Sequence, residues 1–351
     1  MTGVTPESVL AVAGRVEGRL AEVLDAETAR WTELTPDLTW PLDALRRLVL
    51  AGGKRLRPAF CYWGFVGAGG DPDDPRVIDA GAAFELLHAF ALMHDDVMDD
   101  SDTRRGIETI HAEFAARHRG DGWGGESRRF GEGVAILVGD LAHVFADRAL
   151  PDGPPELAAV WDELRIELNI GQYLDVLGTA RADRDEVGAR RIARYKSGKY
   201  TIERPLHIGA ALAGRFAELV EPLSGYGDPL GEAFQLRDDI LGVFGDSALT
   251  GKPVGADLRE GKPTPLLAAA VERSDDGQRA ALDRIGRAEL SDADVADLQM
   301  ILADTGAVAA IETSIERLTD AAVAAVERAP ITSDARDALV GLARYVAERE
   351  H

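Results

Sequence analysis

The sequence predicts an all-α protein, and three observations support that prediction. Apolar residues recur at helical spacing along most of the chain, and the alternating runs typical of strands are nearly absent. Aromatic residues make up only 6% of the chain, whereas Ala, Leu, Glu and Arg, which favour helices, dominate it. With 46% hydrophobic residues, the chain has enough apolar side chains for a substantial core.

The predicted helices follow one another along the chain with ordinary loops between them. Helical periodicity is clearest in residues 9–24, 41–49, 77–97, 155–177, 187–204 and 307–326. Proline and glycine predict loops at residues 67–75, 151–155, 222–229 and 251–265. Residues 119–133, rich in glycine and charge, are expected to form a mobile loop. No change of composition divides the chain, so we predict a single domain over residues 1–351.

Residues 78–98 differ from the other predicted helices. Their sequence, IDAGAAFELLHAFALMHDDVM, is apolar on nearly every side, which is typical of a helix at the centre of a bundle. We find no apolar stretch of about 18 residues that suggests a membrane span, and no targeting segment at the N-terminus. The single cysteine, Cys61, cannot form an intramolecular disulfide and suits a reducing compartment. We therefore expect a cytoplasmic protein without a transmembrane segment.

The net charge bears on the class of partner. The chain has 39 Lys and Arg against 61 Asp and Glu, a formal charge of −22. Binding to nucleic acid draws on clustered cations, so this balance argues against a nucleic-acid partner. The excess acid is either a solvated surface or a set of carboxylates that hold cations, and composition does not choose between them.

The strongest local feature is the sequence DDVMDDSDTRRG, residues 95–106. Residues four apart share a helix face, so Asp95 and Asp99 converge while Asp96 points toward the neighbouring face. Carboxylates that close repel one another unless cations lie between them. Oxygen ligands alone favour Mg²⁺, and the two arginines that follow suit a polyphosphate bound across the metal. The alternative is an acidic, solvated helix end.

A second aspartate pair follows about 140 residues later, in QLRDDILGVFGD. Asp238 and Asp239 again have apolar neighbours, Asp246 lies two helical turns beyond Asp238, and Gly242 stands where the first motif has its second carboxylate. One such pair is weak evidence. Two pairs, each on an apolar helix, predict facing helices that grip one diphosphate through several metal ions.

Cations are scarce in this chain, so their clusters are informative. GGKRLRP places Lys54 and Arg57 three residues apart at a helix start, which predicts an anion site, although an ordinary basic turn has the same residues. It lacks the GxxxxGK[ST] pattern of a P-loop. Lys196 and Ser197 in RYKSGKYT, and Lys252 and Lys262 in TGKPVGADLREGK, are further candidates for a phosphate-binding rim. His88 and His94, on the apolar helix, are either core or site residues.

Together these motifs resemble those of the trans-isoprenyl diphosphate synthases, the polyprenyl synthetase family. GGKRLRP, DDxxD followed by RRG, YKSGKYT, QLRDD and GKPVGADLREGK occur in that family's order between about residues 45 and 265. The resemblance implies an all-α bundle around a central cavity, a homodimer, and three Mg²⁺ ions bound with an allylic diphosphate. It also implies head-to-tail condensation of isopentenyl diphosphate with that substrate by ionisation, condensation and proton elimination.

The resemblance assigns roles to particular residues. The metal ligands are Asp95, Asp99 and Asp238. The residues that bind the allylic diphosphate are Arg104, Lys196, Lys252 and Lys262. Those that bind isopentenyl diphosphate are Lys54, Arg57, His88 and Arg105. Ser197 and Gln235 line the developing carbocation. Gly242 departs from the family pattern, which has an aspartate there, and puts in doubt any metal or water contact made by that carboxylate.

Product length depends, in the resemblance, on the helix that precedes Asp95. Each turn spans about 5.4 Å, close to one isoprene unit, so side chains one, two and three turns earlier act as successive floors. Here they are Phe90 with Ala91, then Leu87, then Phe84. An aromatic residue followed by a small one resembles geranylgeranyl diphosphate synthases, so we predict that product, with farnesyl and longer diphosphates as alternatives.

Two other functions share parts of this pattern. A class I terpene cyclase also ionises a diphosphate at an aspartate cluster, but it has no use for Lys54, Arg57 and Arg105. A non-catalytic subunit of a heteromeric synthase is expected to lose its metal-binding aspartates, and both clusters are present here.

Overall fold

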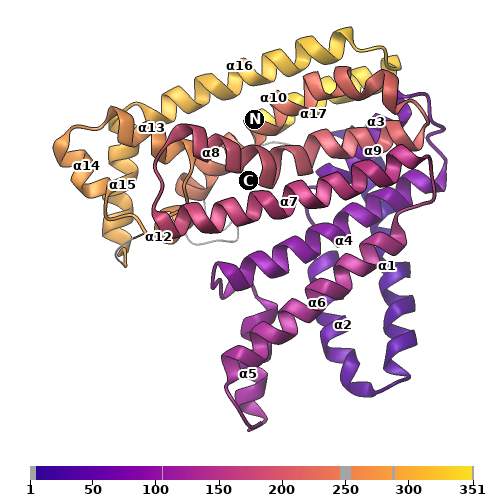
Figure 1. Cartoon of the computed structure of the whole chain (residues 1–351), viewed down its shortest axis with the longest axis horizontal. Helices are drawn as coiled ribbons and strands as arrows, with labels where there is room; N and C mark the ends of the chain where they lie inside the picture. The colour runs from indigo at the N-terminus through magenta and orange to yellow at the C-terminus, as the bar shows by residue number, and fades with distance from the viewer. Residues whose placement is uncertain (1–4, 105, 246–253, 287–288, 350–351) are drawn as a thin grey trace. The chain divides into compact units, whose positions relative to one another are not determined.

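The computed structural model describes residues 5–104, 106–245, 254–286 and 289–349. Apart from one short antiparallel pair of strands, the described residues contain only helices, turns and loops, which confirms the predicted all-α class (Figure 1). The chain forms two compact units. The N-terminal unit comprises Glu7–Tyr62 and Asp71–Asp152, and the C-terminal unit comprises residues 5–6, Trp63–Gly70 and the described residues from 153 onward. The single domain over residues 1–351 stays a prediction.

The N-terminal unit is built around one apolar helix. Its elements are α1 (Glu7–Thr32), η1 (Pro36–Leu38), α2 (Thr39–Leu50), the first part of α3 (Leu56–Gly67), α4 (Pro75–Met98), β1 (Thr103–Arg104), β2 (Ile107–Glu108), α5 (Ile110–Gly120) and α6 (Ser127–Ala149). Helix α4 starts at an N-cap, Asp74, whose side chain accepts a hydrogen bond from the backbone N–H of Arg76. It packs against α1, α2 and α6, and Phe84, Leu86 and Leu87 are fully buried.

Helix α4 is long and apolar enough to cross a membrane by length and composition alone. However, 72% of its most apolar stretch is buried, as expected for the core helix of a bundle. This burial favours the core interpretation, and the absence of a membrane span stays a prediction.

The connection between α5 and α6 is shorter than the mobile loop predicted for residues 119–133. Helix α6 begins at Ser127 because Glu126 caps it, accepting hydrogen bonds from the backbone N–H groups of Arg128 and Arg129. Trp123 packs edge-on against Phe130, with ring centroids 5.3 Å apart. The prediction was wrong for residues 119–120, which end α5, and for residues 127–133, which begin α6, where capping and aromatic packing outweigh the composition.

The C-terminal unit carries the remaining helices of the described residues. They are α7 (Pro155–Arg181), α8 (Glu186–Ile192), the π-helix η2 (Ala193–Glu203), α9 (Arg204–Leu212), α10 (Phe216–Phe244), α12 (Ala256–Glu260), α13 (Pro265–Arg273), α14 (Asp276–Leu282), α15 (Asp292–Asp304), α16 (Ala307–Arg328) and α17 (Ser333–Glu348). Helix α10 packs against η2 and α16, which runs alongside it in Figure 1.

Residues 222–229, predicted as a loop, lie inside α10. Pro222 and Pro229 each remove a helical hydrogen bond, but Leu223, Tyr226 and Leu230 between and beside them are fully buried. The Tyr226 hydroxyl donates a hydrogen bond to the Leu339 carbonyl at 2.8 Å. Tertiary packing therefore overrides the proline signal. In the predicted loop at 251–265, the described part contains the short helix α12.

The helix predicted over residues 187–204 is divided into α8 and the wider η2. Within η2, the Lys199 ammonium pairs with the carboxylates of Glu167 at 3.1 Å and Glu203 at 3.2 Å, and all three side chains are buried. Arg204, the first residue of α9, pairs with Glu167 at 2.7 Å. These paired charges hold the wide turns that carry Lys196 and Ser197.

Candidate functional site

The first aspartate cluster lies at the end of α4 in the N-terminal unit. Arg104, on β1, donates from Nε to Asp96 Oδ1 at 2.6 Å and from Nη2 to Asp95 Oδ2 at 3.1 Å. Strand β2 pairs with β1 through the Arg104–Ile107 register, which turns the chain back toward the helix end. Asp99 is the C-cap residue of α4, one turn after Asp95. Asp96, expected to point aside, is buried against Arg104.

The electrostatics of this cluster keep Arg104 charged. Burial lowers the pKa of Arg104, but the carboxylates of Asp96 and Asp95 outweigh it and raise the pKa above its usual value. A guanidinium held between two carboxylates forms charge-assisted hydrogen bonds in a fixed geometry. The cluster thus places a permanent cation beside the carboxylates predicted to bind metal.

The predicted cationic loop also belongs to the N-terminal unit. Lys54 precedes α3 and Arg57 lies in its first turn, and both side chains are half-buried. Sequence spacing alone placed both at the helix start, whereas the helix begins at Leu56. His88, on α4, is also half-buried.

The residues predicted to control product length are core residues of the N-terminal unit. Leu87 and Phe84 are fully buried, and Phe90 is 8% exposed, while Ala91 is half-buried. The ring of Phe90 stacks on His143 of α6 with centroids 4.7 Å apart and meets His94 edge-on at 4.6 Å. His94 Nε2 lies 3.1 Å from the Ile136 carbonyl oxygen. This contact with the backbone favours the interpretation of His94 as a core histidine.

The second aspartate cluster lies on α10 in the C-terminal unit. Asp238 is partly exposed, and its Oδ1 accepts a hydrogen bond from Arg349 Nη2 at 2.6 Å. Asp239 is 2% exposed, and Gln235 Nε2 donates to its Oδ1 at 2.8 Å. Its Oδ2 is buried without a hydrogen-bond partner. Burial, with smaller contributions from Asp257 and Asp238, raises the pKa of Asp239 well above its usual value.

Gly242 has a structural explanation that the sequence did not offer. A Cβ atom added at Gly242 would lie 1.9 Å from Oδ2 of Asp257, the second residue of α12. The carboxylate of Asp257 therefore occupies the space beside the α10 turn where the family pattern has an aspartate side chain. A carboxylate is present near this turn, but another segment supplies it.

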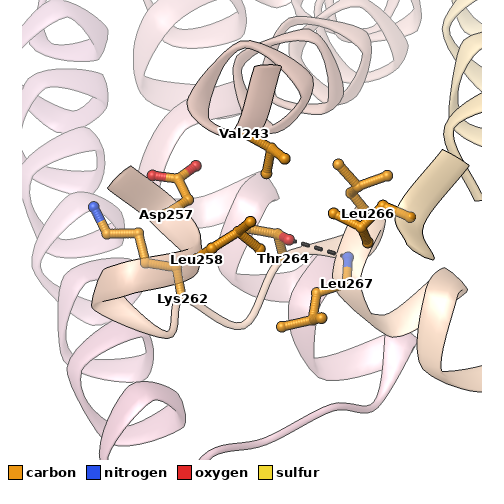
Figure 2. A pocket seen from close by; sticks show the side chains of 8 residues that line it. Val243, Asp257, Leu258, Lys262, Thr264, Leu266 and Leu267 are labelled. Carbon is orange, nitrogen blue, oxygen red and sulfur yellow. Dashed lines mark hydrogen bonds between the residues drawn. The ribbon is translucent and has the colours of Figure 1, made fainter. Parts of the chain in front are cut away.

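Asp257 and Lys262 also border a small pocket whose other residues are mostly apolar. Figure 2 shows their charged ends on one side of the pocket and Leu266 and Leu267 on the other. Lys262 Nζ lies 2.6 Å from Glu260 Oε2. Thr264 accepts a hydrogen bond from the backbone N–H of Leu267 and so caps α13 beside the pocket.

Lys196 has a partner that sequence reasoning missed. Its Nζ lies 2.5 Å from Oδ2 of Asp175, a buried residue of α7. A Cβ atom at Gly171 would lie 2.3 Å from the Lys196 backbone nitrogen, so only glycine allows η2 to approach α7 this closely. Gly171 and Asp175 are four residues apart and so share one face of α7. This spacing was the sequence signal for a close, charged contact with another helix. Ser197, the next residue in η2, is half-buried.

Each of the two units carries one of the aspartate clusters. Asp95, Asp99 and Arg104 gather in the N-terminal unit, and Gln235 and Asp238 in the C-terminal one. Arg105, Lys252 and Asp246 lie outside the described residues.

The carboxylate oxygens of the two clusters fit a hard divalent cation whose coordination shell is completed by oxygen atoms of a substrate. Both clusters present carboxylate oxygens, and the buried Oδ2 of Asp239 has no hydrogen bond that neutralises it. Among the residues that the structure describes, no three Asp, Glu, His or Cys side chains are close enough to hold a metal alone. Magnesium typically keeps waters and takes substrate phosphate oxygens as ligands, so this sparse set agrees with a metal that arrives with a diphosphate.

Comparisons with known proteins agree with these motifs. The profile of the polyprenyl synthetase family matches residues 39–303. A geranylfarnesyl diphosphate synthase from Aeropyrum pernix is 33% identical over 93% of this chain and 99% of its own length. A geranylgeranyl diphosphate synthase from Mycobacterium tuberculosis is 32% identical over 86% of this chain and 81% of its own.

A solved structure extends the likeness to the whole fold. The geranylgeranyl pyrophosphate synthase from Corynebacterium glutamicum, complexed with isoprenyl diphosphate and magnesium, superposes with a TM-score of 0.90. It is 39% identical, and the match covers 95% of this chain and 97% of that one. The chain therefore belongs to the polyprenyl synthetase family and is a prenyltransferase of the isoprenyl diphosphate synthase type.

Proposed function

We propose that this enzyme condenses isopentenyl diphosphate with an allylic diphosphate and releases geranylgeranyl diphosphate. The observation that carries the proposal is the pairing of Arg104 with Asp95 and Asp96, which fixes a cation beside carboxylates at the end of an apolar helix. A diphosphate with an apolar tail has complementary chemistry at both of its ends. A terpene cyclase would not need the separate cationic loop at Lys54 and Arg57.

Three Mg²⁺ ions bind with the allylic substrate in this proposal. In this assignment Asp95 and Asp99 hold two of the ions and Asp238 holds the third. All three carboxylates are partly exposed, so a metal ion can reach them from solvent. When bound, magnesium supplies positive charge that stabilises the leaving diphosphate. The magnesium in the Corynebacterium glutamicum structure supports magnesium as the ion.

The cationic side chains divide between the two substrates. Arg104, Lys196, Lys252 and Lys262 hold the allylic diphosphate, and Lys54, Arg57, His88 and Arg105 hold isopentenyl diphosphate. Two polyanions held in separate pockets lose little further entropy when they react. The isoprenyl diphosphate in the solved relative agrees with this class of substrate.

Each group of residues has a defined task in the reaction. Arg104 and Lys196 meet the negative charge that grows on the diphosphate as the allylic C–O bond breaks. Ser197 and Gln235 line the developing carbocation in this proposal, and the apolar residues of α4 exclude water from it. Lys54 and Arg57 hold isopentenyl diphosphate so that its double bond attacks the cation before a proton is lost.

Phe90 is proposed as the floor that sets product length. Its ring is held between His143 and His94 one turn before Asp95, so the product chain ends against it. Phe90→Ala is expected to give products longer by at least one isoprene unit, as measured by chromatography. Leu92→Ala, on the same helix but on another face, is the matched control. Unchanged products with Phe90→Ala would remove Phe90 from this role.

The enzyme is also proposed to act as a homodimer. Leu137, Leu141 and Val144 form an exposed apolar stripe on α6, and Ile166, Ile170 and Tyr173 form another on α7. Exposed stripes of this kind mark interaction surfaces. Light scattering on the purified protein is expected to give twice the chain mass, and Leu137→Asp to shift it toward the monomer.

The central experiment supplies magnesium, labelled isopentenyl diphosphate and one allylic primer at a time. We expect elongation with at least one primer, with geranylgeranyl diphosphate as the main product. Farnesyl or longer products would correct the chain length and keep the reaction. No condensation with any primer would refute the proposal, and Asp95→Ala serves as the inactive control.

A further inference from the structure

The loop that carries Lys54 has an unusual backbone. Gly52, Gly53 and Arg55 have φ angles of +87°, +153° and +47°. Glycine adopts such angles without strain, but an L-residue such as arginine pays a steric cost. A strained residue persists only where its surroundings hold it, so the contacts of Arg55 need an explanation.

Those contacts use all three nitrogens of the guanidinium. Arg55 is 5% exposed, and its Nη1 donates to Oε2 of Glu85, which is 6% exposed. Its Nη2 donates to the Val49 carbonyl oxygen at 2.9 Å, and its Nε to Oε1 of Glu17 at 3.2 Å. A buried ion pair is weak evidence for stability, because desolvation offsets the attraction, so its value lies in the geometry that it imposes.

The partners of Arg55 explain what that geometry does. Glu85 lies on α4 one turn before His88, on the same face of the helix. Arg55 lies between Lys54 and Arg57 in the sequence, and its side chain is buried while theirs are half-buried. The pair therefore ties the loop that carries Lys54 and Arg57 to the helix turn that carries His88.

We propose that the Arg55–Glu85 pair is a positioning device that sets the spacing of Lys54, Arg57 and His88 for isopentenyl diphosphate. This inference rests on the proposed function, because it needs those three residues to bind that substrate. Arg55 does not touch the substrate. Its left-handed backbone turns its own side chain inward, and the fork of three donors fixes the turn against α1, α2 and α4.

Single substitutions test the pair. Arg55→Lys keeps the charge without the fork, and Glu85→Gln keeps the shape without the charge. Each is expected to raise KM for isopentenyl diphosphate by about 10- to 100-fold while KM for the allylic diphosphate changes less than about twofold. Arg46→Met, which removes an exposed pair with Asp25, is the control and is expected to change neither constant.

A double variant separates positioning from stability. Arg55→Met with Glu85→Met removes both buried charges, and such replacements often preserve or raise stability. We expect it to melt at or above the temperature of either single variant, and KM for isopentenyl diphosphate to stay raised. Hydrogen exchange at residues 52–57 is expected to be faster in this variant. A double variant with wild-type KM for isopentenyl diphosphate would overturn the inference.

The variants Lys54→Ala and Arg57→Ala show whether a negative result refutes only the positioning role of Arg55 and Glu85 or the whole binding site for isopentenyl diphosphate. If both raise KM for isopentenyl diphosphate while the folded Arg55 and Glu85 variants do not, the positioning role is wrong and the site stands. If neither raises that KM, the binding site itself is wrong, and the positioning role falls with it.

Discussion

The two aspartate clusters begin with the same dipeptide but neutralise it differently. In the N-terminal unit, Arg104 reaches both Asp95 and Asp96 from a strand only eight residues beyond the pair. In the C-terminal unit, Arg349 reaches Asp238 from a position 111 residues away, and Asp239 keeps a buried oxygen without a hydrogen bond. The clusters therefore differ at the pair itself: Arg104 pairs with both members of the first pair, whereas Arg349 pairs with Asp238 of the second, and burial raises the pKa of its neighbour Asp239.

This difference implies different demands for metal. A carboxylate that already pairs with a guanidinium is stable without a cation, whereas a buried carboxylate without a partner is costly until positive charge arrives. We therefore expect substrate and magnesium to stabilise the second cluster more than the first. The following predictions test that comparison, from the largest effect to the smallest.

The largest expected effect is on catalysis. Asp95→Asn removes a proposed ligand of two metals and is expected to lower kcat/KM by about 10³-fold or more, and Asp238→Asn by about 10²-fold. Steady-state kinetics with labelled isopentenyl diphosphate measures both. Asp228→Asn, which loses only a surface pair with Arg194, is the control. A larger loss of kcat/KM for Asp238→Asn than for Asp95→Asn would contradict the prediction that the first cluster contributes more to catalysis.

Restoring the family's aspartate at Gly242 is expected to harm the enzyme. The added Cβ collides with the Asp257 carboxylate, so Gly242→Asp is expected to cost about 1–3 kcal/mol of stability and to reduce activity. Gly242→Ala adds the same Cβ without charge and separates steric from electrostatic effects. The double variant Gly242→Asp with Asp257→Ala makes room for the new side chain and is expected to regain activity. If Gly242→Asp alone is as active as the wild type, Asp257 does not occupy that space.

The smallest effect concerns the stability of the metal-free enzyme. The raised pKa of Asp239 means that the folded state binds its proton more tightly than the unfolded state does. Its contribution to stability therefore falls as pH rises above the usual carboxyl pKa of about 3.8. Asp239→Asn is expected to melt about 2–4 °C higher than the wild type at neutral pH in chelator, and to lose this advantage as pH falls toward 4.

The same melting experiment is repeated with magnesium and an allylic diphosphate in place of chelator. With magnesium and an allylic diphosphate, the wild type is expected to gain more thermal stability than Asp239→Asn, because only the wild type has the buried carboxylate to neutralise. Asp96→Asn, which disrupts the Arg104 pair, is expected to melt lower in chelator. If Asp239→Asn also melts lower in chelator, the buried oxygen is not a source of instability.

The sequence predicted what depends on short spacing and missed what depends on distant packing. The all-α class and the gathering of Asp95 with Arg104 follow from helical periods and a short loop, and the structure has both. Pro222 and Pro229 predicted a loop because local rules do not include the packing of Tyr226 against α17. The position of Asp257 beside Gly242 could not be predicted from spacing.

Charged partners were the hardest to predict. Asp175, Glu85 and Arg349 act through residues far from them in sequence, and no local pattern identifies such pairs. Glu85 was hidden within an apolar run, although a carboxylate at the centre of such a run requires a partner. The need for such a partner was the only sequence signal that Glu85 pairs with a buried cation such as Arg55.

The most direct test of the account is a count of bound metal. Manganese, read by electron spin resonance, replaces magnesium in the presence of a non-ionising thio analogue of an allylic diphosphate. The account predicts three ions per chain for the wild type, two for Asp238→Asn, and at most one for Asp95→Asn with Asp99→Asn. Three ions bound to Asp238→Asn, or none bound to the wild type, would contradict the division of metals between the two clusters.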